Sequence, residues 1–270
     1  MVRRYLTGAV ALTVAATLAA GCDSGGTDDQ AAPAPTVQSS APAEPEPTAS
    51  APPTESAPSP APTASKPPKP PKPQKLKTGA KGEKVTALQE RLTELGYWNG
   101  KADGTFGGQT QQAIYALQKA AGLSRDGVVG PKTEKALADG VRPKARSTSG
   151  RVIEISLKKQ LLMVVDDGKV GQVFNTSTGS MEHYEQNGNT FLADTPSGKF
   201  KVGRQIDGWR HAPLGLLWRP KYFNGGIAVH GANSVPPYPA SHGCARLSIS
   251  AMNHLWSSDA IPLKTKVWVY

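Results

Sequence analysis

Two short apolar runs, Val152-Ile153-Glu154-Ile155-Ser156-Leu157 and Gln160-Leu161-Leu162-Met163-Val164-Val165, decide the fold of the C-terminal half of this 270-residue chain. Both runs are rich in apolar residues and only two lysines separate them, which is typical of neighbouring strands. An Asp166-Asp167-Gly168 turn then leads into a third run at residues 170–174, as in a β-hairpin. The pattern predicts a sheet built from adjacent strands.

Further apolar segments continue to the C-terminus. We expect strands at residues 198–203, 226–230 and 267–270, and a helix at residues 250–257. The stretch from Arg151 to Tyr270 is long enough to bury a core of its own. Residues 151–270 are therefore predicted to form a mainly β domain, either a sandwich or a barrel, with one short helix.

A segment with a different sequence pattern precedes this domain. Asp103-Gly104-Thr105-Phe106-Gly107-Gly108-Gln109-Thr110 is echoed 23 residues later by Asp126-Gly127-Val128-Val129-Gly130-Pro131-Lys132-Thr133, and each copy reads as a tight turn that feeds a helix. Apolar residues around the two copies recur at helical spacing. They are Val85, Leu88, Leu92, Leu95, Ala113, Ile114, Leu117, Ala136 and Leu137. A small three-helix bundle over residues 77–140 follows, joined to the β domain by a linker at residues 141–150.

The N-terminus carries an export signal. Arg3 and Arg4 precede an apolar run at residues 9–20, and small residues lead into Cys22. This arrangement resembles the lipobox of bacterial lipoproteins, which implies a signal peptide at residues 1–21 and lipidation of Cys22. Soluble secretion stays open as an alternative, because Leu18 stands four places before the cysteine and the usual leucine stands three before.

A Pro- and Ala-rich segment separates the signal from the helical module. Residues 31–74 are almost entirely Pro, Ala, Ser, Thr and Lys and hold no aromatic residue, so they cannot bury enough apolar surface to fold. If the segment were fully extended as polyproline, at about 3.1 Å per residue, it would reach on the order of 140 Å. We expect residues 22–76 to be a lipidated, disordered tether.

The charge of +10 belongs to the part of the chain that is predicted to fold. Residues 1–76 hold six basic and six acidic residues, whereas residues 77–150 hold 12 and 7 and residues 151–270 hold 13 and 8. A basic exported protein suits an anionic wall matrix. Nucleic acid is excluded as a partner by the export signal and by the lack of an Arg-rich helix or recognition motif.

The chemistry points to Cys244. This thiol lies in Ser241-His242-Gly243-Cys244, fourteen residues after His230, and it has no disulfide partner once Cys22 is lipidated. A free thiol needs a neighbouring base to become a nucleophile, which an imidazole supplies. Backbone amides of a turn that contains a flexible glycine supply donors for an oxyanion. The segment therefore combines a nucleophile, a base and an oxyanion site, and it calls for no cofactor.

These sequence patterns resemble those of two protein families. The helical module resembles the peptidoglycan-binding type 1 domain in Leu95-Gly96-Tyr97, Asp103-Gly104-x-Phe106-Gly107 and Leu117-Gln118. Ile227-Ala228-Val229-His230-Gly231 followed by Ser241-His242-Gly243-Cys244-Ala245-Arg246 resembles the YkuD-type L,D-transpeptidases. The resemblance implies that the thiol attacks a tetrapeptide stem of peptidoglycan, releases D-alanine and passes the acyl group to an acceptor amine.

The resemblance also implies roles for individual residues. Cys244 would be the nucleophile and His230 the general base, with the carbonyl of Gly231 orienting the imidazole. Amides around His242, Gly243 and Cys244 would form the oxyanion hole. Ser241 and Arg246 would brace the turn or meet a substrate carboxylate, Tyr222 would line the cleft, and Tyr97 and Trp98 would either contact glycan or close the small core.

Three alternatives remain at this point. A zinc peptidase could use Cys244, His230 and His242 as ligands, although the chain lacks an H-E-x-x-H motif and an H-x-H pair. A wall-binding lipoprotein without activity is a second reading, and an L,D-carboxypeptidase that hydrolyses the same donor is a third. In each case we expect a monomer outside the cytoplasmic membrane whose partners are peptidoglycan and, through the anchor, lipid.

Overall fold

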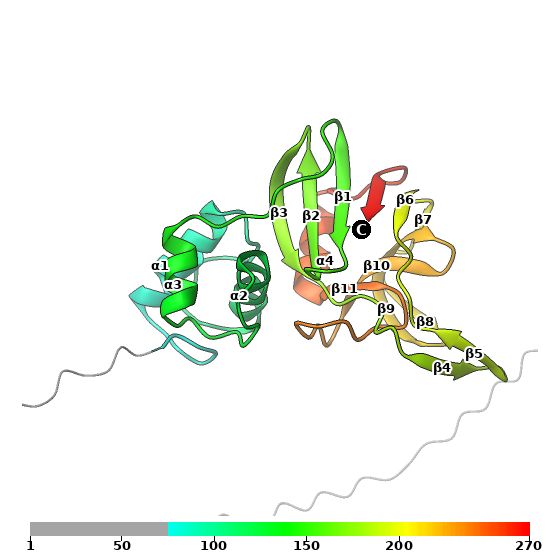
Figure 1. Cartoon of the computed structure of the whole chain (residues 1–270), viewed down its shortest axis with the longest axis horizontal. Helices are drawn as coiled ribbons and strands as arrows, with labels where there is room; N and C mark the ends of the chain where they lie inside the picture. The colour runs from blue at the N-terminus through cyan, green and yellow to red at the C-terminus, as the bar shows by residue number, and fades with distance from the viewer. Residues whose placement is uncertain (1–74) are drawn as a thin grey trace, which may run out of the picture. The chain divides into compact units, whose positions relative to one another are not determined.

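The computed structural model describes residues 75–270 (Figure 1). The predicted signal peptide, Cys22 and almost all of the predicted tether lie outside these residues. Three helices make the first module: α1 at Glu83–Glu94, α2 at Gly108–Ala121 and α3 at Pro131–Ala138. They occupy the positions at which the apolar spacing placed helices. None of the helices in residues 75–270 is long and apolar enough to cross a membrane.

One buried glutamine stabilises each of the two echoed turns. The Gln89 Nε2 atom donates to Asp103 Oδ1 at 2.9 Å and to Thr110 Oγ1 at 3.0 Å, while its Oε1 atom accepts from the amide of Gly104 at 2.9 Å. Gln118 repeats this arrangement with Asp126, Thr133 and Gly127. Each glutamine thus satisfies a turn and the start of a helix at once, which gives the sequence echo a structural cause.

The second module is built from two five-stranded sheets, a β-hairpin and a helix. The first sheet has the order β3-β2-β1-β12-β6. The second has the order β11-β10-β9-β7, with β8 also paired to β9. The first sheet comprises β1 at Arg151–Ser156, β2 at Leu161–Asp166, β3 at Lys169–Asn175, β6 at Gly198–Lys201 and β12 at Lys266–Val269.

The second sheet comprises β7 at Arg204–Gln205, β8 at Trp209–Ala212, β9 at Gly215–Asn224, β10 at Ile227–Ala232 and β11 at Ala245–Ser248. The hairpin is β4 at His183–Gln186 with β5 at Asn189–Leu192, and helix α4 spans Ile249–Ser257. The expected strands at residues 151–174, 198–203, 226–230 and 267–270 and the expected helix are therefore confirmed. The hairpin and the β8–β9 ribbon were not predicted.

Strands β1 and β2 of the first sheet are buried on both faces, which explains their continuous apolar runs. Leu161, Met163, Val165 and Val173 belong to the buried cluster of the three-helix module. The alternate residues pack against the second sheet and α4. They include Ile153, Ile155, Leu162, Val164 and Phe174.

The predicted linker at residues 141–150 is held by a buried carboxylate. Glu154 of β1 is fully buried and accepts hydrogen bonds from the amides of Arg146 and Ser147 and from the hydroxyl of Tyr270. The Arg146 guanidinium lies 3.7 Å from the centre of the Tyr270 ring. A buried carboxylate is tolerated when its oxygens are satisfied in this way, so this segment is a fixed part of the fold.

Helix α2 contacts the second module through buried polar groups. The Lys119 amine donates to the carbonyl oxygens of Gln160 at 2.8 Å and Thr176 at 3.0 Å, and also to the side chain of Asn175. Burial, together with the charge of Arg125, lowers the pKa of Lys119 to about 6. The amine connects α2 to the end of β3 and to the segment that follows it.

The same helical module holds the loop at residues 233–240, which connects β10 to the turn before β11. Gln112 of α2 donates to the carbonyl of Val235 at 3.1 Å, and Arg125 donates to the carbonyl of Pro237 at 2.9 Å. From the other side, Ser177 donates to the carbonyl of Tyr238 at 2.8 Å. This 233–240 loop is the chain segment between His230 and Cys244.

Candidate active site

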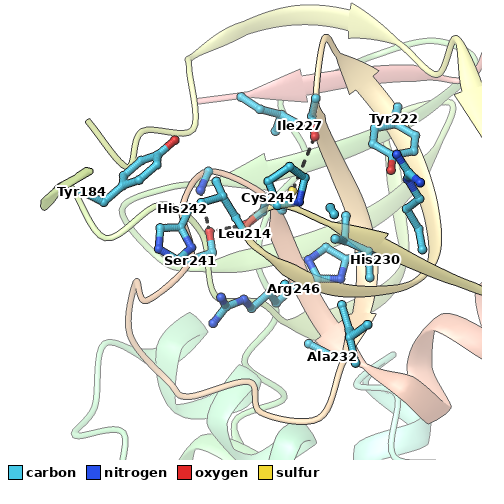
Figure 2. Close-up of a pocket in the computed structure, with 18 of the residues that line it drawn as sticks. Tyr184, Leu214, Tyr222, Ile227, His230, Ala232, Ser241, His242, Cys244 and Arg246 are labelled. Carbon is cyan, nitrogen blue, oxygen red and sulfur yellow. Dashed lines mark hydrogen bonds between the residues drawn. The ribbon is translucent and has the colours of Figure 1, made fainter. Parts of the chain in front are cut away.

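Two parallel neighbouring strands bring His230 and Cys244 together. His230 of β10 pairs in register with Arg246 of β11, and Cys244 lies two positions before that arginine. Side chains alternate between the two faces of a strand, so all three lie on one face. Val229 and Ala245 point the other way, into the core. Figure 2 shows the thiol and the imidazole in the same pocket.

The imidazole of His230 is held as a neutral base. Its side chain is 4% exposed, and Nδ1 lies 2.9 Å from the carbonyl oxygen of Gly231. A carbonyl only accepts, so Nδ1 carries the proton and Nε2 keeps its lone pair. Burial lowers the pKa of His230 to about 4, with a smaller contribution from the charge of Arg246. The expected orienting role of the Gly231 carbonyl therefore has a direct geometric basis.

A strand irregularity and a glycine make room for this histidine. The register between β9 and β10 shifts between Val229 and Gly231, so His230 has no paired residue on β9. A Cβ atom at Gly231 would lie 2.9 Å from the Trp218 ring and 3.2 Å from the Cβ of Met252. Any side chain at position 231 would therefore displace the carbonyl that orients the imidazole.

Cys244 is half-buried and lies beside the backbone of β10. Its Sγ atom is 3.8 Å from the carbonyl oxygen of Gly226. Burial raises the pKa of the thiol, and a hydrogen bond from the amide of Ala228 and the charge of Arg246 oppose this only in part. Burial therefore favours the uncharged forms of both the thiol and the imidazole.

Ser241 braces the turn that carries the thiol. Its hydroxyl donates to the carbonyl of Cys244 at 2.6 Å and accepts from the amide of Gly243 at 3.0 Å. The amide of Gly243 is thus occupied, which corrects its expected role as an oxyanion donor. Among residues 75–270, no acceptor is found for the amides of His242 and Cys244, and these two are available to an oxyanion.

Gly243 contributes through its conformation. Its φ of 140° is a region that favours glycine, and a Cβ atom there would lie 2.6 Å from the carbonyl oxygen of Asp194. Gly179 is equally restricted, because a Cβ atom would lie 2.3 Å from the carbonyl oxygen of Ala193. The segment at residues 193–195 therefore packs directly on the backbone of the catalytic turn.

Thr195 joins these segments and was not predicted as a site residue. Its buried hydroxyl accepts from the amide of Gly179 at 2.9 Å and donates to the carbonyl of Gly243 at 2.6 Å. The sequence signal was the Thr195-Pro196-Ser197-Gly198 segment, which matched the family without showing what the hydroxyl does. This hydroxyl thus joins two chain segments that lie 48 residues apart in the sequence, and it fixes the carbonyl of Gly243, the residue before Cys244.

The other predicted side chains are distributed around a cavity of about 630 Å³. Arg246 lines it and donates to the carbonyl of Ala240 at 3.2 Å, which braces the 233–240 loop. Tyr222 lines it from β9. His242 is exposed and packs edge-on against Tyr184, with 4.8 Å between ring centres. The bracing role expected of Ser241 fits its two hydrogen bonds within the turn.

The aromatic pair at residues 97 and 98 packs within the fold, with Tyr97 buried and Trp98 partly buried. Tyr97 is fully buried and donates to the carbonyl of Val141 at 2.8 Å. Trp98 stacks on His254 of α4, with 5.3 Å between ring centres, and packs near Phe174. Of the two roles weighed for this pair, packing is the one observed.

The zinc alternative lacks a ligand set. Within residues 75–270, no group of three or more His, Cys, Asp or Glu side chains is placed to hold a metal ion. Cys244 and His230 line the pocket with no third ligand beside them, since the ring of His242 packs on Tyr184. The fold and the pocket therefore define a class: a β-sandwich domain with a thiol and a buried imidazole in one cavity, preceded by a helical module.

Comparisons with known proteins identify the family. Residues 150–269 match the L,D-transpeptidase catalytic domain, YkuD, and residues 81–137 match the putative peptidoglycan binding domain. The crystal structure of an L,D-transpeptidase from Xylanimonas cellulosilytica is 54% identical, with a TM-score of 0.73, over 75% of this chain and 100% of that one. The chain belongs to the YkuD-type L,D-transpeptidase family and carries a peptidoglycan-binding domain.

Curated relatives share a smaller part. The N-acetylmuramoyl-L-alanine amidase CwlL of Bacillus licheniformis is 49% identical over 79 residues, which is 28% of this chain and 22% of that protein. A spore cortex-lytic enzyme of Bacillus cereus is 41% identical over 67 residues, 25% of this chain and 26% of that protein. The chain thus spans about a quarter or less of these relatives, and their activities do not transfer to it.

Proposed function

We propose that this protein cross-links peptidoglycan, with Cys244 as the nucleophile that takes a peptide from a tetrapeptide stem and transfers it to an acceptor amine. One observation carries the proposal: a thiol, a buried imidazole and two amides that find no acceptor within residues 75–270 belong to residues that line one cavity. The family assignment supplies the substrate class.

The first half-reaction forms an acyl-enzyme. The sulfur attacks the carbonyl of the third stem residue as its proton passes to Nε2 of His230, and the amides of Cys244 and His242 stabilise the oxyanion. The C–N bond to D-alanine then breaks. The imidazolium returns the proton to the leaving nitrogen, so D-alanine departs as a neutral amine and a thioester remains.

The second half-reaction releases the enzyme. An acceptor amine attacks the thioester and loses a proton to His230, the C–S bond breaks, and the sulfur recovers that proton as a thiol. Water in place of the amine would yield a tripeptide, which is the L,D-carboxypeptidase alternative. Both outcomes use the same acyl-enzyme, so the choice depends on which nucleophile occupies the acceptor side of the cavity.

The protein acts outside the cytoplasmic membrane, and the lipid anchor at Cys22 is part of the proposal. Signal, anchor and tether would place the enzyme on the outer face of the membrane with reach into the wall, while the peptidoglycan-binding domain holds it near glycan. A Cys22→Ser variant tests the anchor. It should move from the membrane fraction to the medium and lose the mass of the diacylglycerol.

Muropeptide analysis tests the activity. Purified protein incubated with tetrapeptide donors should release D-alanine and form direct links between third residues, and a Cys244→Ala variant should form none. Tripeptides alone would identify a carboxypeptidase. Absence of both products, together with no mass increase at Cys244 after exposure to a carbapenem, which the family accepts as an acylating mimic, would leave a binding protein without activity.

A further inference from the structure

The charged side chains that line the cavity around Cys244 are all basic. Three arginines line it, Arg204, Arg210 and Arg246, and none of its lining residues in the described chain is an Asp or Glu. Three guanidinium groups elsewhere in residues 75–270, those of Arg91, Arg151 and Arg219, have acidic partners. Arg219 pairs with Asp207 at 2.7 Å and Arg151 pairs with Asp166 at 2.7 Å. The pocket therefore presents positive charge that the described chain does not neutralise.

Arg204 is held flat against an aromatic ring. Residue 204 pairs in register with Tyr222 of β9, and its guanidinium carbon lies 3.6 Å from the centre of the Tyr222 ring. Tyr222 itself is only 7% exposed, so the platform is fixed. Stacking uses the face of the guanidinium and leaves the N–H donors along its edge free to bind a planar anion.

Arg210 faces the same cavity from the neighbouring ribbon. It pairs in register with Leu217 of β9 and is exposed. Within the described residues, the side chains of Arg204 and Arg210 form no ion pair and donate no hydrogen bond to a protein group. Both strands that carry them, β7 and β8, pair with β9, on the opposite side from β10.

We propose that Arg204 and Arg210 form a subsite for a free carboxylate of the donor stem peptide, separate from the carbonyl that Cys244 attacks. This inference rests on the proposed function, because it specifies the donor of that same site. Cys244 directly precedes β11, so the backbones of β7 and β8 lie three strand spacings of about 4.8 Å, about 14 Å in all, from the strand next to the nucleophile. The arginine side chains span part of this length and extended peptide, at about 3.4 Å per residue, spans the rest, so the carboxylate belongs to a stem residue away from the scissile bond.

The subsite would make the enzyme selective for stems whose carboxylates are free. A guanidinium binds a carboxylate through paired charge-assisted hydrogen bonds, whereas a carboxamide offers one acceptor and no charge. Loss of one such contact weakens binding roughly tenfold to a hundredfold. An amidated donor should therefore bind the unmodified enzyme about that much more weakly than the acidic donor.

Binding to the full-length Cys244→Ala protein tests this, because the donor stays intact. Calorimetric titrations would use a tetrapeptide with free stem carboxylates and the same peptide with those carboxylates amidated. Arg204→Gln and Arg210→Gln are the test variants. Lys266→Gln is the control, since it removes the same charge from an exposed position outside the cavity lining.

We expect Kd for the acidic donor to rise roughly tenfold to a hundredfold in each arginine variant and to stay unchanged in the control. The amidated donor should bind all four proteins with similar affinity. Equal weakening of both donors, or no weakening, would overturn the subsite while leaving the proposed function intact. If neither donor binds the parent protein, which carries Cys244→Ala alone, the subsite and the proposed function both fail.

Discussion

The echoed turns of the helical module and the turn that carries Cys244 are held by buried side chains whose hydrogen bonds differ in their longest reach along the sequence. In the module, Gln89 and Gln118 bond to turns and helices that lie at most 21 residues away in the sequence. In the catalytic domain, Thr195 joins Gly179 to Gly243 across 16 and 48 residues. Local networks give the module its stability, whereas long-range networks give the catalytic turn its geometry. Changes to the two kinds should therefore have different consequences.

The largest expected effect comes from the base. A His230→Ala variant should lose roughly 10²–10⁴-fold in kcat/KM for acyl-enzyme formation, because burial raises the thiol pKa and His230 is the proposed acceptor of the thiol proton. The rate of acylation, followed by mass spectrometry, measures this. A loss below tenfold would show that the thiol ionises without the imidazole.

Thr195 tests the long-range network. Thr195→Val keeps the shape of the side chain but leaves the amide of Gly179 and the carbonyl of Gly243 without a partner. We expect kcat to fall about tenfold or more with KM little changed, and stability to fall by about 1–3 kcal/mol. Thr195→Ser keeps the hydroxyl and should restore most of the activity. A serine variant as impaired as valine would contradict the hydrogen-bonding role.

Lys119 tests the contact between the helical module and the catalytic domain. Lys119→Met leaves the side-chain oxygen of Asn175 and the carbonyl of Thr176 without a donor and removes one of the two donors to the carbonyl of Gln160, so we expect a loss of about 1–3 kcal/mol in unfolding free energy. Because Asn175 and Thr176 precede the Ser177 that holds the 233–240 loop, kcat on a soluble tetrapeptide should fall severalfold as well. The exposed Glu90→Ala on α1 is the control. Unchanged kcat with lowered stability would show that this contact stabilises the fold without affecting catalysis.

Gln118 tests the local network and should have the smallest effect on chemistry. Gln118→Leu removes the partner of the Gly127 amide and one of the two donors to the Val128 carbonyl, and it should cost about 1–3 kcal/mol of stability, measured by denaturant unfolding. Gln89→Leu should behave alike because it occupies the equivalent place in the other turn. Activity on a soluble donor should be unaltered by either. A matching loss of kcat would mean that the module transmits local damage to the site.

The sequence predicts what local patterns encode. Apolar runs identified the strands of the first sheet, and Asp167 and Gly168 at φ of 46° and 77° confirm the predicted hairpin turn. The hairpin β4–β5 escaped prediction because its side chains are mostly exposed, so no burial constrains their pattern. Residue type and spacing predicted that Cys244 and His230 belong to one site, and both line the same cavity.

Other parts of the site depend on contacts across the chain. The hydroxyl of Thr195 gains its role only when residues 179 and 243 meet beside it. The occupied amide of Gly243 likewise depends on the rotamer of Ser241. Spacing along the sequence encodes neither. Trp98 shows the converse, because an aromatic residue next to a turn reads equally well as a binding residue or, as observed, as packing against His254.

The central claim is that Cys244 and His230 rest as a neutral thiol and a neutral imidazole, and the pH dependence of thiolate absorbance tests it most directly. The difference in absorbance near 240 nm between the unmodified protein and Cys244→Ala isolates this thiol. Burial raises its pKa above the ordinary 9.0 and lowers the pKa of His230 to about 4. We predict no thiolate signal between about pH 5 and pH 8 and a signal that rises only above pH 9. A thiolate signal already present at neutral pH would show a resting ion pair and contradict the account.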